Sequence, residues 1–214
     1  MIDSIFKLAW SLPALLFAIT IHEYSHGRMA DFLGDPTPRL AGRLTLNPIA
    51  HLDPIGALSL LIFRFGWAKP VPINPLNFKN YRRDTILTAL AGPASNLLSA
   101  FLFSWVFKIS LNLANHISTN DLPQIGLVFI RGWFILLSYG VIFNLVLAVF
   151  NLIPLPPLDG SLILLSLLPA KWSYEIEKYK TYSYILLVIF IFTGVVEKIM
   201  HPILNFFLIT FNLL

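Results

Sequence analysis

The chain contains no cysteine among its 214 residues. Disulfide bonds are therefore excluded, and so is any metal site built from thiolate ligands. A metal ion could be bound only by histidine, carboxylate or water ligands.

Charged residues are also scarce. Asp, Glu, Lys and Arg make up 12% of the chain, whereas 57% is hydrophobic, and the mean hydropathy is +0.74. A soluble domain carries about 25% charged residues, so this chain could not cover a water-exposed surface. The composition indicates a polytopic membrane protein. We interpret the net charge of +4 as cytoplasmic loop charge rather than as a nucleic-acid-binding surface.

The apolar runs predict an all-α fold, a polytopic membrane helix bundle with four to six spans. Long spans are expected at about residues 8–29, 86–107 and 126–150, and shorter apolar segments at 182–196 and 203–214.

Two further segments are expected to lie at the membrane surface or to enter it only partly. Residues 42–67 join turn formers to an apolar run that is too short to span, which predicts a short re-entrant or β-like loop with Arg43–Leu46 as a short strand. Residues 171–180 predict a charged amphipathic helix. No long soluble block interrupts the sequence, so residues 1–214 are expected to form a single integral-membrane domain.

The distribution of positive charge predicts the orientation. Residues 28–85 hold eight of the fifteen Lys and Arg residues, and residues 109–125 hold none. Because cytoplasmic loops are enriched in these residues, we expect residues 28–85 to face the cytoplasm.

The pentapeptide His22-Glu23-Tyr24-Ser25-His26 directly follows an uncharged apolar run. Positions i and i+4 share one helical face, so His22 and His26 can bind one metal ion, with Glu23 beside it as a general base. Chance would produce this H-E-x-x-H pattern only about 0.002 times in a chain of this composition. The simpler interpretation is a helix end whose histidines reach toward the interface.

A hydrolytic zinc site needs a third protein ligand. Asp159 is the only acidic residue between Gly132 and Leu168, and it follows prolines that interrupt an apolar stretch. A lone carboxylate at membrane depth needs a cation, which makes Asp159 a candidate. It could instead cap a helix that begins at Gly160, and His51, His116 and His201 are the remaining histidines.

An H-E-x-x-H motif late in one span, combined with the Asn151–Gly160 sequence N-L-I-P-L-P-P-L-D-G after another, resembles the site-2 protease family of intramembrane zinc metalloproteases. Further stretches resemble its compact prokaryotic branch, which lacks the PDZ insertion: residues 34–37, 42–48, 51–56, 68–72 and 91–96.

This resemblance implies that His22, His26 and Asp159 bind one Zn²⁺ ion and that Glu23 is the catalytic general acid and base. Asn151 would also be catalytic, because its amide could donate to a developing oxyanion or orient Asp159; the alternative is a cap at the end of a helix. His51 could line a water path or be a loop histidine bonded to a carbonyl, and we favour the second interpretation.

The implied function is hydrolysis of peptide bonds in or near transmembrane segments of membrane proteins, as in regulated intramembrane proteolysis. The expected partners are a transmembrane protein substrate and the lipid bilayer, without nucleic acid. The expected location is the cell membrane, as a multi-pass protein with its site toward the cytoplasm. The alternatives are a divalent-metal transporter, which does not need Glu23, and a non-proteolytic membrane scaffold of the same fold.

Unwound substrate backbone needs hydrogen-bond partners within a membrane. We therefore expect Arg43–Leu46 to offer a strand edge to which a substrate could pair.

Overall fold

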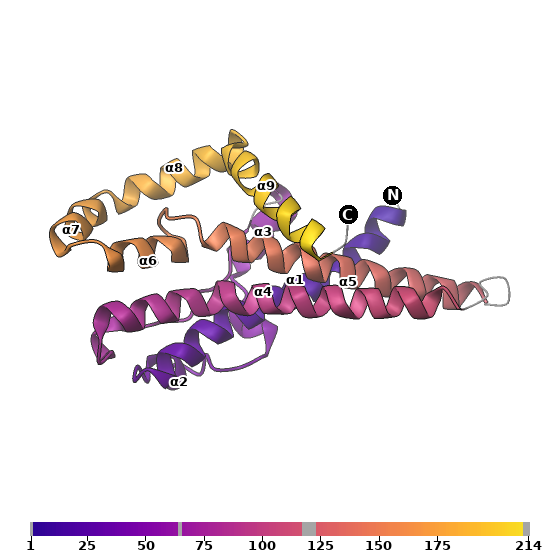
Figure 1. The fold of residues 1–214 in the computed structure, drawn as a ribbon, viewed down its shortest axis with the longest axis horizontal. Coiled ribbons are helices and arrows are strands. Elements are labelled where there is room, and N and C mark those ends of the chain that lie inside the picture. The colour runs from indigo at the N-terminus through magenta and orange to yellow at the C-terminus, as the bar shows by residue number, and fades with distance from the viewer. Residues whose placement is uncertain (1, 64–65, 117–122, 212–214) are drawn as a thin grey trace.

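The computed structural model describes residues 2–63, 66–116 and 123–211, and within these ranges the fold is helical and contains no strand (Figure 1). The helices, in chain order, are α1 (Ile2–Phe32), α2 (Thr37–Leu40), α3 (Pro54–Phe63), α4 (Tyr81–Ala114), α5 (Gln124–Asn151), α6 (Asp159–Leu167), α7 (Ala170–Lys178), α8 (Lys180–Phe192) and α9 (Val195–Thr210). Short 3-10 turns cover Pro48–His51 and Pro75–Asn77.

Three described helices, α1, α4 and α5, are long and apolar enough to cross a membrane, and they pack against one another. Figure 1 shows α4 and α5 running side by side over most of their length. Helices α8 and α9 would form a fourth span if taken together, although they are bent by 70° at Gly194, which has a left-handed backbone (φ 74°). The described helices therefore provide three spans, or four if the bent pair is one span. Of the expected four to six spans, only the lower limit is reached.

Glycines allow the long helices to approach closely. A Cβ atom on Gly132 of α5 would overlap the Trp10 ring of α1, and one on Gly140 would overlap the Phe103 ring of α4. Small residues at helix contacts are what close packing in a bilayer requires, since the lipid offers no hydrophobic driving force between helices. Many large apolar side chains of α1, α4 and α5 remain on the outside of this bundle, among them Phe17, Leu98 and Phe129.

The expected short strand at Arg43–Leu46 is not formed; these residues are irregular in the described structure. The β-like pairing in this region is a single antiparallel bridge between Leu52 and Ala68. A ladder cannot continue beyond it because Pro70 and Pro72 have no N–H to donate.

The apolar part of the same region forms α3, whose ten residues would span only about 15 Å. This length agrees with the expected re-entrant or interfacial segment. The expected amphipathic helix at residues 171–180 corresponds to α7, where Trp172 and Tyr174 are exposed.

Candidate metal centre

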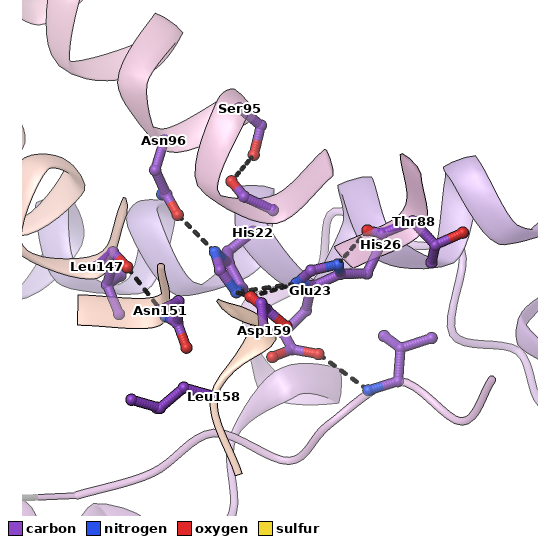
Figure 2. Close-up of polar contacts among 12 residues, drawn as sticks. His22, Glu23, His26, Thr88, Ser95, Asn96, Leu147, Asn151, Leu158 and Asp159 are labelled. Carbon is purple, nitrogen blue, oxygen red and sulfur yellow. Dashed lines mark hydrogen bonds and ion pairs between the residues drawn. The ribbon is translucent and has the colours of Figure 1, made fainter. Parts of the chain in front are cut away.

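The H-E-x-x-H motif lies within α1, and His22 and His26 share one face of it. Each histidine is only 6% exposed. That face packs against α4, and the carboxylate of Asp159 approaches from the beginning of α6. Figure 2 shows the two imidazoles and this carboxylate converging on one point.

Three potential ligand atoms form a nearly equilateral triangle. The Nε2 atoms of His22 and His26 are 3.0 Å apart, and each lies 3.2 Å from Oδ2 of Asp159. Zinc bonds of about 2.0–2.1 Å in a tetrahedral arrangement separate neighbouring ligands by about 3.3 Å. The triangle therefore has the dimensions of three ligands around one zinc ion.

The tautomer of His22 is determined by an amide on α4. Nδ1 of His22 lies 2.6 Å from Oδ1 of Asn96, and the Asn96 amide nitrogen donates to the carbonyl of Ala18 and to Oδ1 of Asn144. The amide orientation is thus set by its own hydrogen bonds. Because Oδ1 can only accept, the imidazole must carry its hydrogen on Nδ1, which leaves the Nε2 lone pair directed at the triangle.

The Asn96 amide belongs to a chain of hydrogen bonds that crosses the bundle. Asn144 of α5 donates to the carbonyl of Gly140 at 2.7 Å and accepts from Asn96 at 2.8 Å. Both amides have no exposed surface. The candidate ligand His22 is therefore oriented from α5 through α4, in the manner by which outer hydrogen bonds orient metal ligands.

The second histidine is held in the same way by backbone. Nδ1 of His26 donates to the carbonyl of Thr88 at 2.8 Å, so its Nε2 also presents a lone pair to the triangle. Two lone pairs and a carboxylate oxygen would repel one another at these distances without a cation between them.

Asp159 adds a further sign that this site fits a cation. Its Oδ2 atom is buried and has no hydrogen-bond partner in the described structure. Asp159 is the first residue of α6 rather than its cap, and α6 has no side-chain cap hydrogen bond. The capping alternative therefore does not account for this carboxylate, whereas a metal ion bound by His22, His26 and Asp159 does.

Gly92 of α4 makes room for the two imidazoles. A Cβ atom built on this glycine would lie 2.7 Å from Cε1 of His22 and would overlap Nε2 of His26. Any side chain at this position would enter the space that the ligands surround.

Glu23 lies beside the ligands, with one oxygen bonded to a loop (Figure 2). Its Oε2 atom accepts the backbone N–H of Val71 at 2.9 Å. This donor could not be found from sequence reasoning, because it is a backbone group far along the chain.

Asn151, the other expected catalytic residue, ends α5. Its amide nitrogen donates to the carbonyl of Leu147 one turn earlier, at 3.0 Å (Figure 2). This hydrogen bond belongs to the helix end and does not reach Asp159.

His51 has no exposed surface, and its Nε2 atom donates to the carbonyl of Thr45 at 2.8 Å. This geometry agrees with a loop histidine bonded to a carbonyl.

Comparison with known proteins places the chain among peptidases. Residues 73–195 match the model of peptidase family M50. The chain is 37% identical over 195 residues to the Bacillus subtilis protein named "Putative zinc metalloprotease YwhC", with 89% of this chain and 84% of that protein covered. It is 24% identical over 188 residues to "Putative zinc metalloprotease Rip2" of Mycolicibacterium smegmatis, covering 86% of this chain and 66% of that protein. No solved structure matches significantly.

The family match covers more than half of the chain, and the match to the Bacillus protein extends over most of both sequences. Both agree with the cluster of His22, His26 and Asp159, which could hold a metal. The chain therefore belongs to peptidase family M50, the site-2 protease family, and is a zinc metalloprotease of the membrane.

Proposed function

We propose that this metalloprotease cleaves peptide bonds in or near transmembrane segments of other membrane proteins, at a site inside the bilayer, as a step of regulated intramembrane proteolysis. The observation that carries the proposal is the depth of the candidate metal centre. Gly92, which contacts both histidines, lies about three turns into α4, or about 16 Å of helix rise. α1 and α4 are both candidate spans, so a substrate would meet the site at membrane depth.

The catalytic chemistry follows from the residues at this site. A zinc ion bound by His22, His26 and Asp159 would supply a Lewis acid and an activated water at neutral pH. Glu23 accepts the proton as water attacks the scissile carbonyl, and then delivers it to the leaving amine. The low exposure of both histidines keeps bulk water away from the reacting groups, which strengthens the electrostatic interactions there.

In this proposal, Asn151 acts only after its side chain has changed conformation. Its amide is engaged with the Leu147 carbonyl, so donation to a developing oxyanion would require rotation of this side chain on substrate binding. Hydrogen bonds at catalytic sites commonly form fully only in the substrate complex.

The substrate would pair with the irregular residues around Thr45. The carbonyl of Thr45 is bonded to His51, whereas Leu44 and Leu46 have no backbone hydrogen bonds in the described structure. The N–H and C=O groups of Leu44 and Leu46 are therefore available to a substrate strand. Leu46→Pro removes one of these donors, because proline has no N–H. If Leu46→Pro still folds and cleaves substrate at the wild-type rate, this docking proposal is wrong.

The first experiment compares wild type with Glu23→Gln in liposomes that contain labelled single-span substrates. Zinc content is measured on both proteins. We expect wild type to cleave within or beside the membrane segment, and Glu23→Gln to retain zinc without cleaving. Glu175→Gln is a matched control, since Glu175 lies on α7 and pairs with Lys178 away from the site.

The location of the cut distinguishes the possible outcomes. Cleavage only of soluble peptides would contradict an intramembrane substrate. Transport of zinc into the liposomes, equal for wild type and Glu23→Gln and without cleavage, would favour the divalent-metal transporter instead.

A further inference from the structure

The loop of residues 69–74 contacts the active-site face of α1. In its Pro70-Val71-Pro72 sequence, the N–H of Val71 is the only backbone donor, because proline has none. That donor is bonded to Oε2 of Glu23. A Cβ on Gly27 would lie 3.1 Å from Cγ1 of Val71, so the glycine after the H-E-x-x-H motif lets this loop approach α1 closely.

The upstream end of the loop is fixed by a buried pair of residues. The N–H of Lys69 donates to the carbonyl of His51 at 2.9 Å, and Nη2 of Arg43 donates to the carbonyl of Lys69 at 2.6 Å. Arg43 is only 8% exposed. Both the N–H and the carbonyl of Lys69 are therefore hydrogen-bonded.

The downstream end of the loop is fixed by Asp35, which has no exposed surface. Its Oδ2 accepts the N–H of Asn74 at 2.7 Å, and its Oδ1 accepts the side-chain amide of Asn77 at 2.7 Å. Oδ1 also accepts from the backbone and hydroxyl of Thr37. Asp35 thereby joins the connection between α1 and α2 to the loop that carries Val71.

We propose that residues 69–74 form a base-positioning loop, in which the N–H of Val71 holds the carboxylate of Glu23 and the buried carboxylate of Asp35 keeps that N–H in place. Asp35 is then a positioning residue that acts through Val71 without touching substrate. The inference rests on the proposed role of Glu23 as the general base.

The hydrogen bond from Val71 orients the carboxylate of Glu23. A glutamate side chain has three rotatable bonds, and proton transfer requires the carboxylate to lie within hydrogen-bond reach of the attacking water. Fixing Oε2 through Val71 leaves Oε1, which has no hydrogen bond in the described structure, free to accept that proton. The reaction is faster when the reacting group is already oriented, because its conformational freedom does not have to be lost in the transition state.

The direct test replaces the Val71 amide by an ester, using the α-hydroxy analogue of valine. This change removes the N–H and keeps the side chain. We expect kcat to fall by about ten- to hundredfold, since a hydrogen bond to a charged group is lost, with KM and zinc content unchanged. The matched control is the same ester at Ile73, whose N–H has no partner among the described residues. A kcat for the Val71 ester within twofold of wild type would overturn the proposal.

The part played by Asp35 is tested by a double-mutant cycle. Asp35→Asn should lower kcat, and combining it with the Val71 ester should lower kcat no further than the ester alone, because both act on the same hydrogen bond. Asp31→Asn is the control, since Asp31 is paired with Arg28 and Arg39 and not with the loop. Additive effects would mean that Asp35 only stabilises the fold, which would overturn its positioning role.

Glu23→Gln separates this inference from the proposed function. If Glu23→Gln remains active, the general-base assignment fails and the inference fails with it. If Glu23→Gln is inactive while the Val71 ester has wild-type kcat, only the base-positioning loop is disproved.

Discussion

Asn96 shows why a single buried amide can matter to a candidate metal ligand one helix away. It accepts from His22 with its oxygen and donates twice with its nitrogen, to Ala18 and Asn144. Neither an alcohol nor a carboxylate offers one acceptor and two donors in this arrangement. The amide therefore fixes the His22 tautomer and also links α1, α4 and α5.

We expect Asn96→Leu to weaken zinc binding by about 10- to 100-fold, as loss of a hydrogen bond to a metal-binding histidine commonly does. Asn96→Asp should lose less affinity than Asn96→Leu, because a carboxylate still accepts from Nδ1 of His22, although it no longer donates to Ala18 and Asn144. Affinities would be measured by competition with a chromogenic chelator. Ser99→Ala is the control, since Ser99 bonds only within α4. Equal affinities for Asn96→Leu and wild type would show that the amide serves packing alone.

Gly92 provides a steric test of the same centre. Gly92→Ala places a methyl group against Cε1 of His22 and Nε2 of His26, so we expect zinc content and proteolysis to fall at least tenfold. Gly126→Ala is the comparison within α5, because its methyl group would meet only Pro123, at 3.8 Å or more. Full zinc occupancy in Gly92→Ala would contradict the close approach of α4 to the ligands.

At the scale of the elements, the sequence predicts the features that depend on local residue spacing. His22 and His26 follow from a four-residue spacing on one helix, and the three long helices follow from apolar runs. Asp159 could be proposed as a third ligand only by combining its place after a broken helix with a family resemblance. The sequence thus indicated the candidate ligands and most of the fold.

The contacts that the sequence did not predict depend on how separate elements face each other. The pairing of Asn96 with Asn144 requires the rotation of α4 relative to α5, and the bond from Val71 to Glu23 uses a backbone N–H that has no side-chain signature. The short strand at Arg43–Leu46 was predicted wrongly because strand residues need a partner strand, and no described segment pairs with these residues. Non-local geometry of this kind cannot be read from local patterns.

Asp35 makes the stability of the protein depend on pH through the connection between α1 and α2. Burial acts to raise the pKa of this carboxyl group, but hydrogen bonds from Thr37, Asn77 and the backbone of Asn74 outweigh it and hold the pKa below its ordinary value. A carboxylate whose pKa is lowered on folding stabilises the protein above its unfolded pKa of about 4, and this contribution is lost as the pH falls further.

We therefore expect Asp35→Asn to be less stable than wild type at pH 7, by about 2 kcal/mol for lost hydrogen bonds to a charged group. The difference should shrink as the pH falls below about 4, where wild-type Asp35 becomes protonated. Thermal unfolding in detergent at several pH values measures it, with Asp31→Asn as the reference. A difference that is constant between pH 7 and pH 3 would rule out the ionised carboxylate as its cause.

At the scale of the whole molecule, the candidate metal centre, the base-positioning loop and the irregular residues near Thr45 all lie toward one end of α4. That end carries exposed cations, among them Lys79, Arg82 and Arg83, while the opposite end of α4 leads into residues 109–125, which contain no Lys or Arg. This difference in positive charge between the two ends of α4 predicts that the base-positioning loop and the residues around Thr45 lie on the cytoplasmic side. Substrates would then be cleaved near the cytoplasmic end of their membrane segments.

The absence of cysteine makes this orientation directly measurable, because the unmodified chain gives no background with thiol reagents. Lys79 and Asn115 are exposed at opposite ends of α4, whose 34 residues span about 50 Å, more than the hydrocarbon core of about 30 Å. In intact cells, a membrane-impermeant maleimide should label Asn115→Cys, and it should label Lys79→Cys only after the membrane is opened. Retained proteolysis by both variants would show that the labelled proteins are folded. The reverse labelling pattern would place the base-positioning loop outside the cell, and substrates would then be cut near the opposite end of their membrane segments.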